Sequence, residues 1–328
     1  MPVFKSIIIG SGNIGAFYDN PKSENILTHA HAYSKHPDTK LVAFIDSDIS
    51  KAQKAAQIWG GKYYTDIHKC LELEKPDIIS LCAPTKYHFD LLIQIIDYNP
   101  KFIFLEKPIC STIDQSKEIM ERLKNNKIPV NINYVRRFDP KLNELLRNYE
   151  SGDYGNYING CAFYGKGISN NGSHCIDFIL WFFKRIKSFI NTQKIIDWKD
   201  DDPSFGVSFE LEDDKYFYLL PADERHYSII EFDLLFEKAR IKLKQFGLKL
   251  SLQIVRDDPI FPGYQDLTEE NITQSGLNKS LYYSVDNIVK HLIKNEDITS
   301  PFENGYHVQK ICNKITNSPL MVKQFINI

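Results

Sequence analysis

The residues of this sequence that are best suited to chemistry lie in the segment 102–109, FIFLEKPI. Its first four residues are apolar and predict a short strand buried in a parallel sheet. Glu106 and Lys107 follow where that strand ends, and ligands of open α/β sheets bind beyond the carboxyl ends of the strands. A poorly solvated lysine there has a lowered pKa and can exchange protons near neutrality. Taken alone, however, an EKP sequence is more often a surface Glu–Lys pair.

His174 and Asp177 form a second pair of ionisable residues, at the start of an apolar stretch that closes at Phe183. The stretch predicts a buried helix, and residues three apart share one face of a helix. A helix this apolar has no structural need for an ionisable pair near its start. Two interpretations stay open for this segment, an acid/base pair that serves a reaction or a core histidine that caps the helix.

Three glycines near the N-terminus predict a binding site for phosphate groups. Residues 3–9 read as a buried strand that runs into Gly10, Gly12 and Gly15, spaced as G-x-G-x-x-G. After a strand, such glycines allow a tight turn, a close approach of the backbone to a pyrophosphate, and close packing of helix on strand. The N–H groups of the next helix then receive the phosphate charge.

Asp46 closes the next predicted strand, 41–45. An acidic residue at this point hydrogen-bonds the adenine ribose of NAD and repels the 2′-phosphate of NADP. Asp46 lies 31 residues after Gly15, more than the roughly 20 that are usual. We attribute the excess to the polar stretch 18–27, which interrupts the first helix. Without that insertion, Asp46 would be a strand-end carboxylate with no ligand.

The first half of the chain alternates between strand and helix patterns, which predicts a doubly wound parallel sheet. The remaining predicted elements are helices at 51–59, 66–73, 87–98 and 112–125 and strands at 77–81, 102–105 and 128–134. His29, His31 and His36 lie on the resumed first helix, where positions i and i+2 point to different faces. We therefore expect packed or solvent-facing histidines and no metal site.

The pattern changes in the second half to alternation with a period of two, which predicts antiparallel strands with one buried face. The runs are 205–211, 230–236 and 246–254, and Asp213 and Asp214 lie in a turn between strands. A helix ending near 148 and a loop rich in Gly, Asn and Tyr precede them. The acidic run 197–202 reads as a solvated loop, and two amphipathic helices close the chain.

Composition excludes several classes of protein. The 328 residues allow two domains or one large α/β domain. A net charge of −2 gives no electrostatic case for nucleic acid or an anionic membrane. The apolar runs are too short to cross a bilayer, and the first strand begins too early for a signal peptide. The six cysteines form no CxxC pair, so free thiols in a soluble, cytoplasmic protein are expected.

Together these motifs resemble the Gfo/Idh/MocA family of sugar and polyol oxidoreductases. The similarity extends over nearly the whole chain. It comprises GSGNIG at 10–15, CAPTKYH at 82–88, EKP at 106–108, YVRRFDP at 134–140, NNGSHCID at 170–177 and SPFENGYHVQKICNKITNS at 300–318. The resemblance implies an NAD-binding Rossmann domain at 1–135. It also implies an α+β domain at 136–328, built on a mostly antiparallel open sheet, for substrate binding and oligomerisation.

The resemblance also implies roles for individual residues. Lys107 matches the catalytic lysine, His174 the general acid/base, and Asp177 the carboxylate that contacts a substrate hydroxyl or orients the histidine. The implied cofactor-binding residues are Gly10, Gly12, Asn13, Ile14, Gly15, Asp46, Ala83, Pro84, Thr85, His88, Glu106 and Lys107. The sequence departs from the family at Asn170, where many members have Asp, and an amide cannot accept a proton.

These observations predict an NAD(P)-dependent oxidoreductase, with NAD preferred to NADP, that acts on a secondary alcohol or ketone of a sugar, nucleotide-sugar or cyclic polyol. The expected substrate contacts are polar and come from Lys107, Arg137, Asn170, His174 and Asp177; Arg136 is a further candidate. Either arginine could instead pair with Glu144. The resemblance implies a homodimer or homotetramer joined through the C-terminal sheet. The alternative is a non-catalytic NAD-binding regulator or scaffold on the same fold.

Overall fold

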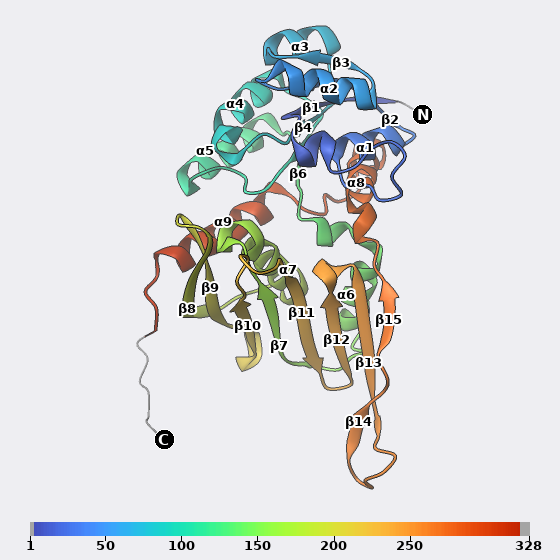
Figure 1. Ribbon diagram of the computed structural model, residues 1–328, viewed down its shortest axis with the longest axis vertical. Helices are drawn as coiled ribbons and strands as arrows, with labels where there is room; N and C mark the ends of the chain where they lie inside the picture. Colours follow the sequence, from blue (N-terminus) through green and yellow to red (C-terminus); the bar gives the residue numbers. More distant parts are fainter. Residues whose placement is uncertain (1–2, 322–328) are drawn as a thin grey trace. The chain divides into compact units, whose positions relative to one another are not determined.

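In the computed structural model, which describes residues 3–321, the chain folds into two compact units (Figure 1). Unit 1 contains the chain up to Asp139 together with Leu277–Gln309. Unit 2 contains Pro140–Gly276 together with the chain from Lys310 onward. The predicted domains 1–135 and 136–328 differ from these units chiefly in Leu277–Gln309, which returns to the N-terminal unit.

Unit 1 is built on a six-stranded parallel sheet with the strand order β3-β2-β1-β4-β5-β6. This is the order of a dinucleotide-binding Rossmann fold, and the predicted α/β class is confirmed. The strands are β1 (Phe4–Ile9), β2 (Thr39–Ile45), β3 (Lys62–Tyr64), β4 (Ile78–Leu81), β5 (Phe102–Leu105) and β6 (Val130–Ile132). Strand β3 was not predicted because it is short, half-exposed and lies at the sheet edge, so it has no apolar run.

Four helices of unit 1, α1, α2, α3 and α5, begin at polar caps that the sequence supplies. Thr112 and Gln115 form the predicted capping box, and Thr28, Asp48 and Asp66 each accept a hydrogen bond from a first-turn N–H group. The helices are α1 (His29–Lys35), α2 (Ile49–Trp59), α3 (Ile67–Glu74), α4 (His88–Tyr98), α5 (Ile113–Asn126) and α8 (Ser280–Lys294), and helix α9 (Phe302–Asn317) begins in this unit.

Helix α8 belongs to the core of unit 1 although it follows the whole of the second sheet in sequence. Its Leu281, Val285 and Ile288 are buried in the same apolar cluster as Tyr33 of α1 and Phe44 of β2. The amphipathic period predicts this helix correctly. The period does not indicate which of the two sheets the apolar stripe covers. The predicted second domain, 136–328, therefore included α8.

Unit 2 is built on a nine-stranded, mostly antiparallel sheet (Figure 1). The strand order is β14-β13-β12-β11-β7-β10-β9-β8, with β15 also paired to β13, and only the β7–β10 pair is parallel. The strands are β7 (Tyr157–Tyr164), β8 (Ser188–Lys199), β9 (Asp202–Glu210), β10 (Tyr216–Pro221), β11 (Ile230–Phe236), β12 (Ala239–Lys244), β13 (Lys249–Asp257), β14 (Gln265–Leu267) and β15 (Asn271–Gln274). The predicted sheet type is confirmed.

Some strands of unit 2 depart from the predictions. Strand β7 falls in the stretch predicted as a loop, because its Gly and Asn residues disguise a central strand. The predicted run 246–254 begins too early, since Phe246 and Leu248 lie in a turn and are 38% and 37% exposed. Asp213 and Asp214 do lie in the turn between β9 and β10, both with φ of 54°.

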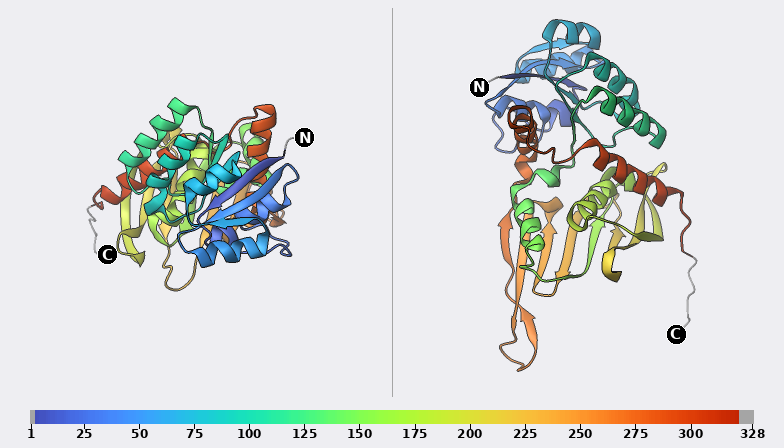
Figure 2. Two further views of the ribbon diagram at one scale, coloured as in Figure 1. Left: turned by 90° about the horizontal axis from the view of Figure 1, so that it is seen from above. Right: turned by 180° about the vertical axis from the view of Figure 1, so that it is seen from behind.

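Two helices of unit 2, α6 (Pro140–Glu150) and α7 (Ser173–Phe183), pack against its sheet through aromatic side chains (Figure 2). The ring centroids of Phe178 on α7 and Phe232 on β11 are 4.4 Å apart, and those of Phe178 and Phe182 are 5.3 Å apart. Tyr149 on α6 stacks on Phe182 at 5.0 Å. Such rings bury large apolar areas and so anchor α7 firmly.

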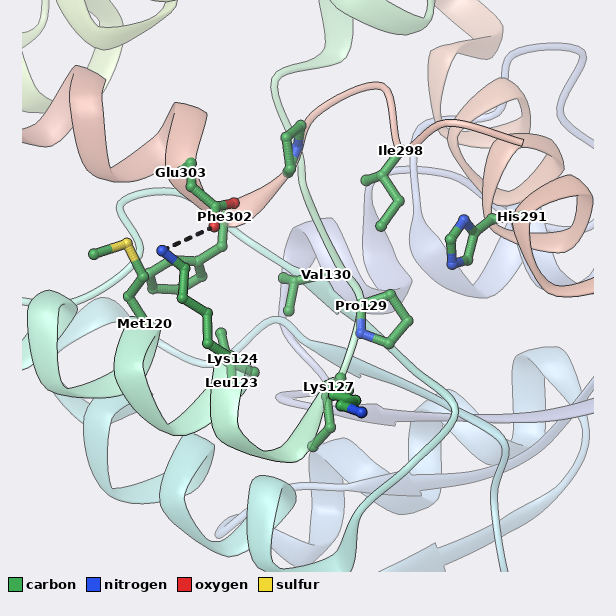
Figure 3. Close-up of a pocket in the computed structure, with 12 residues that line it drawn as sticks. Met120, Leu123, Lys124, Lys127, Pro129, Val130, His291, Ile298, Phe302 and Glu303 are labelled. Atoms are coloured by element: carbon green, nitrogen blue, oxygen red, sulfur yellow. Dashed lines mark ion pairs between the residues drawn. The ribbon is translucent and has the colours of Figure 1, made fainter. Parts of the chain in front are cut away.

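A pocket of about 330 Å³ opens in unit 1 between the end of α5, the start of β6, the end of α8 and the start of α9 (Figure 3). Lys124 and Glu303 form an ion pair of 3.7 Å at its rim. Because it lies at the amino end of β6, this pocket is not at the sheet edge where a dinucleotide binds. Within residues 3–321 no helix is both long and apolar enough to span a membrane.

Candidate active site

The strands of unit 1 are parallel, so their carboxyl ends lie side by side. The predicted cofactor residues that follow these strands are therefore brought together at this end of the sheet. The Gly10 N–H donates to Ile45 O at the end of β2 over 2.8 Å, and the Glu106 N–H donates to Leu81 O at the end of β4 over 3.0 Å. The glycine loop, Asp46 and Glu106 therefore lie together at the carboxyl ends of the strands, where Rossmann folds bind their ligands.

The glycine loop requires glycine at two of its positions. Gly10 has a φ of 97°, and a Cβ atom there would clash with the backbone of Ala83. A Cβ on Gly15 would clash with Gly10 O, whereas one on Gly12 would meet no atom within 4 Å. The open space beside Gly12 is what a pyrophosphate needs, so the loop fits the dinucleotide that its spacing predicts.

The helix after this loop is shorter than predicted. It is a single π-helical turn, Asn13–Phe17, and the chain is non-helical from there to α1. Asp19 holds this inserted stretch by accepting hydrogen bonds from Leu27 N and Thr28 Oγ1, both of 2.6 Å. The predicted interruption of the first helix is thus confirmed, and its ordered course explains the long spacing from Gly15 to Asp46.

Asp46 lies beside the glycine loop and helps to fix it. Its Oδ2 accepts a hydrogen bond of 2.8 Å from Ser11 N, and its Oδ1 accepts one of 3.0 Å from Asp48 N. Each carboxylate oxygen has two lone pairs, so both retain capacity for a ribose hydroxyl. The side chain is only half-buried, which leaves it accessible to a ligand on the loop.

The segment after β4 contains Ala83, Pro84 and Thr85 and leads to His88, the first residue of α4, which ties it to the loop after β5. The buried His88 ring lies with Nε2 2.7 Å from Ala83 O and Nδ1 3.2 Å from Ile109 O. Burial lowers the pKa of His88 and outweighs the opposing effect of these carbonyls. His88 therefore links two segments of the candidate cofactor site. Pro84 is exposed and Thr85 is half-buried, so both remain accessible to a ligand.

Glu106 is a buried carboxylate with two hydrogen-bond donors. His29 Nε2 lies 3.0 Å from its Oε1, and Asn133 Nδ2 donates to the same atom over 2.6 Å. Burial raises the pKa of Glu106, but these partners and the charge of Lys107 hold it below its usual value. Lys107 itself is half-buried at the end of β5.

His29 and Asn133 were not predicted as partners of Glu106. They are distant from it in sequence, and no spacing rule relates the three positions. The predicted packed role of the histidines is confirmed, since His29, His31 and His36 are all buried. Across the described residues 3–321, no cluster of His, Cys, Asp and Glu is arranged to hold a metal ion.

In unit 2, His174 and Asp177 lie on the first turns of α7, as predicted. Asp177 is 1% exposed and His174 is half-buried. A π-helical turn, Gly167–Gly172, precedes the helix and contains Asn170. The apolar remainder of α7 is held by its aromatic contacts, so the two ionisable residues sit on a rigid support.

The acidic run 197–202 is the predicted solvated turn only at Asp200 and Asp201, and its two ends lie on strands. Asp202 lies on β9 and accepts hydrogen bonds from Ser169 N at 2.8 Å and Asn170 N at 3.0 Å. Asp197, on β8, is 3% exposed and accepts a hydrogen bond of 2.7 Å from Lys166 N. Both carboxylates thus satisfy backbone donors of the turn before α7, although burial raises the pKa of Asp202. A charge count along the chain cannot reveal this role.

The contact between Gly167 and Asp202 can be tested by a double-mutant cycle. Gly167 has a φ of 80°, and a Cβ there would clash with the Asp202 carboxylate. We expect Gly167→Ala to destabilise the protein by about 2 kcal/mol or more. Asp202→Ala, which removes two backbone partners, should cost about 1–3 kcal/mol. Urea denaturation should show less destabilisation for the double variant than the sum for the two single variants, because the clash with the Asp202 carboxylate is gone and only the clash with the backbone oxygen of residue 202 remains.

Gly152→Ala is the matched control for this cycle. Gly152 has nearly the same φ, 84°, but a Cβ there would meet no atom within 4 Å. It should cost only about 1–2 kcal/mol of backbone strain and combine additively with Asp202→Ala. Additive free energies for the Gly167 pair would contradict the proposed contact.

Known proteins resemble this chain most clearly in its first half. Residues 4–134 match the GFO_IDH_MocA family profile, described as an oxidoreductase family with an NAD-binding Rossmann fold. The scyllo-inositol 2-dehydrogenase (NAD(+)) of Bacillus subtilis is 28% identical over 165 residues, which cover 50% of this chain and 44% of that protein. The D-glucoside 3-dehydrogenase of Escherichia coli is 25% identical over 151 residues, 44% of this chain and 43% of that protein. The matches therefore span less than half the length of these curated relatives.

Solved structures resemble the chain over almost its full length. The UDP-N-acetylglucosamine 3-dehydrogenase GnnA of Acidithiobacillus ferrooxidans matches with a TM-score of 0.75 and 12% identity, covering 96% of this chain and 97% of that one. The WlbA dehydrogenase of Bordetella pertussis, in complex with NADH and UDP-GlcNAcA, matches with a TM-score of 0.76 and 13% identity, covering 96% and 94%. At these identities the likeness establishes the fold alone. The family profile over residues 4–134 agrees with the resemblance read from the motifs: this part of the chain is an NAD-binding Rossmann domain of the GFO_IDH_MocA oxidoreductase family.

Proposed function

We propose that this protein is an NAD(P)-dependent dehydrogenase or reductase that acts on a secondary alcohol or ketone of a sugar, nucleotide-sugar or cyclic polyol. The observation that carries this proposal is Lys107, which directly follows the ionised, buried Glu106 at the sheet edge that also holds the glycine loop. A cation at that point can stabilise negative charge that develops on a substrate oxygen. The dehydrogenase names of the relatives support the same reaction class.

The proposed roles divide the reaction between the residues. NAD, when bound, supplies the hydride acceptor or donor. His174 takes the proton of the substrate hydroxyl in the oxidative direction and returns it in the reductive one. Lys107 donates a hydrogen bond to the same substrate oxygen, an electrostatic contribution of roughly 3 kcal/mol or more. Asp177 contacts a substrate hydroxyl or orients His174. Asn170, an amide, can bind a hydroxyl but does not accept its proton.

The geometry of unit 1 supports the proposed cofactor contacts. Gly10, Gly12 and Gly15, with Asn13 and Ile14, would hold the pyrophosphate, and the loop Ala83–Pro84–Thr85 would line the path toward Glu106. Asp46 would accept hydrogen bonds from the adenine ribose. This assignment makes NAD the preferred cofactor, because a 2′-phosphate would face the Asp46 carboxylate.

We expect the unchanged protein to bind NAD(H) more tightly than NADP(H), and Asp46→Ala to narrow that gap. Asp46→Asn removes the charge but keeps part of the scaffold, because the amide oxygen can still accept the hydrogen bond from Ser11 N while the one from Asp48 N is lost. If the charge sets the preference, Asn should relax it nearly as much as Ala while the loop stays intact. Fluorescence titration with both cofactors measures this. Equal or tighter binding of NADPH by the unchanged protein would contradict the assignment.

The proposed substrate carries several hydroxyl groups. Lys107, Arg137, Asn170, His174 and Asp177 are the proposed contacts, and each polar side chain that a substrate buries must find a partner. A hexose derivative, free or linked to a nucleotide, suits this set best, with inositols next. Arg136 or Arg137 would add a charge partner for a phosphate or carboxylate. Glu144, the alternative partner of these arginines, forms an ion pair of 2.9 Å with Lys141.

A substrate panel under saturating NAD⁺ and NADH tests the proposal. It should include nucleotide-sugars, free sugars, inositols, 2-hydroxy acids and aromatic dihydrodiols, with cofactor absorbance as the readout. We expect turnover in the first three groups. Turnover confined to the last two would contradict the substrate class. NAD binding without turnover of any compound would favour the alternative, a non-catalytic NAD-binding regulator or scaffold.

The proposed assembly is a homodimer or homotetramer joined through the outer face of the unit 2 sheet. Large apolar side chains on its central strands support this, since Phe163, Tyr216, Leu220 and Leu235 are 37–43% exposed. Phe163 and Leu220 are direct neighbours across β7 and β10. Exposed apolar patches of this kind often mark interfaces between proteins. Light scattering of the purified protein measures the subunit number.

A cytoplasmic location is proposed because all six cysteines are free thiols.

A further inference from the structure

A chain of buried hydrogen bonds runs through unit 1 from helix α1 to the carboxyl end of β5. The Tyr33 hydroxyl lies 2.8 Å from Ser80 Oγ, which in turn lies 2.9 Å from His29 Nδ1. His29 Nε2 lies 3.0 Å from Glu106 Oε1, the same atom that accepts from Asn133 Nδ2. Tyr33, Ser80 and His29 are fully buried. The chain thus connects the interior of unit 1 to the residue just before the proposed catalytic lysine.

The partners fix the direction of each hydrogen bond in this chain. An ionised carboxylate only accepts, so His29 Nε2 must carry a proton to donate to Glu106. His29 Nδ1 then accepts from the Ser80 hydroxyl, and Ser80 Oγ accepts from the Tyr33 hydroxyl. Every proton in the chain then has an acceptor. The geometry therefore corresponds to a neutral His29 ring with its proton on Nε2.

The other protonation states of His29 leave a group unsatisfied. With both ring nitrogens protonated, Nδ1 would donate to Ser80 Oγ, and one of the two hydroxyl protons would have no acceptor within the described residues. A buried donor without a partner costs about 1–3 kcal/mol. With the proton on Nδ1 alone, two acceptors would face each other at 3.0 Å, His29 Nε2 and Glu106 Oε1. The Phe104 ring, with its centroid 4.3 Å from that of His29, packs against the imidazole and adds no polar partner.

This arrangement solves an energetic problem at Glu106. A buried carboxylate pays a desolvation penalty and tends to take up a proton. A neutral Glu106 could rotate and donate its own hydrogen bond, and the negative charge beside Lys107 would be lost. The two donors on Oε1 oppose both changes, because they stabilise the ionised form and hold it in one orientation.

We propose that His29 is a positioning residue for the reaction of this protein: as a neutral Nε2–H donor, oriented by Ser80, it keeps Glu106 ionised and fixed beside Lys107. The inference rests on the proposed function for its catalytic consequence, but not for the protonation state of the ring. A nearby negative charge favours the charged form of a lysine. Lys107 consequently enters the reaction as a cation at a defined place, ready to donate to the substrate oxygen.

His31 provides a matched control on the same helix. Its ring is also fully buried, and its Nδ1 lies 2.7 Å from Asp19 Oδ2, so it too pairs with a carboxylate. Asp19 belongs to the inserted stretch and not to the strand edge that holds Lys107. Replacing either histidine by leucine removes a buried histidine–carboxylate pair, and a purely structural role predicts the same consequence for both.

The kinetic test compares three variants on a substrate found with the panel. We expect His29→Leu to lower kcat about tenfold or more, with KM for the substrate and Kd for NAD within about twofold of the unchanged protein. His29→Gln, whose amide can still donate to Glu106, should restore kcat to within about threefold. His31→Leu should lower thermal stability but keep kcat within about twofold. Equal kcat for His29→Leu and His31→Leu, or no restoration by His29→Gln, would overturn the proposal.

A spectroscopic test needs neither cofactor nor substrate. Long-range ¹H–¹⁵N correlation spectra of the ¹⁵N-histidine protein at neutral pH distinguish the two neutral tautomers from the doubly protonated ring. The protein has nine histidines, and the signal lost in His29→Gln identifies His29. We expect the neutral Nε2–H pattern. A doubly protonated ring, or the Nδ1–H tautomer, would overturn the proposal even if His29→Leu failed to fold.

The two tests separate the proposal from the proposed function. If no compound of the panel is turned over but His29 gives the Nε2–H signal, the enzyme assignment fails while the buried chain stands. If turnover is found and the tautomer is wrong, the enzyme assignment stands and His29 does not position Glu106 as described.

Discussion

Lys107→Met and His174→Ala are each expected to lower kcat at least about 100-fold while NAD binding stays intact. The lysine variant loses the cation that would stabilise charge on the substrate oxygen, and methionine preserves much of its apolar stem. The histidine variant loses the proton acceptor. Since both residues are assigned to one proton-transfer step, the double variant should be little slower than either single variant. Steady-state kinetics with cofactor titration measures both effects.

Control residues of the same type distinguish this result from a general loss of charge. Lys124 lies at the pocket of Figure 3, at the amino end of β6, and His226 is exposed on unit 2. Lys124→Met and His226→Ala should leave kcat within about twofold of the unchanged protein. Near-normal turnover in both Lys107→Met and His174→Ala would remove the catalytic assignment.

The second large effect concerns stability and arises far along the chain from the glycine loop. Ile288→Ala on α8 is expected to destabilise the protein by about 2–5 kcal/mol, because it opens a cavity in the core of unit 1. Ile288 is fully buried, whereas Ile293 on the same helix is 39% exposed. Ile293→Ala should therefore cost no more than about 0.5 kcal/mol.

Urea denaturation of the two isoleucine variants, followed by circular dichroism, measures this difference. NAD titration adds a second readout, because only a destabilised unit 1 should lose cofactor affinity on mild heating. If both substitutions changed the free energy of unfolding equally, α8 would not be part of that core.

The sequence was sufficient for features whose cause is local. Strand β5, which ends just before Glu106 and Lys107, is predicted by an apolar run followed by a proline. The glycine loop is predicted by a glycine spacing that few other structures need. The insertion before α1 was also predictable, because a polar stretch with a proline interrupts a helix whatever surface that helix packs against.

Features that depend on distant partners were not predictable from the sequence. The role of Asp202 follows from two N–H groups more than 30 residues earlier. The hydrogen bond between His29 and Glu106 joins residues 77 apart. Neither pairing has a periodicity or a motif, because hydrogen bonds between elements depend on how the chain folds back and not on local spacing. The same reason explains why α8 was recognised as a helix but fell within the predicted domain 136–328.

The return of α8 to unit 1 has a consequence for biosynthesis. Translation delivers the six strands of that unit early, but the helix that fills its core is made only after Pro140–Gly276 of unit 2. At usual elongation rates the interval is roughly 10 s or longer. During that time the surface around Tyr33 and Phe44 lacks its apolar cover, so we expect the nascent Rossmann sheet to expose apolar surface until α8 has left the ribosome.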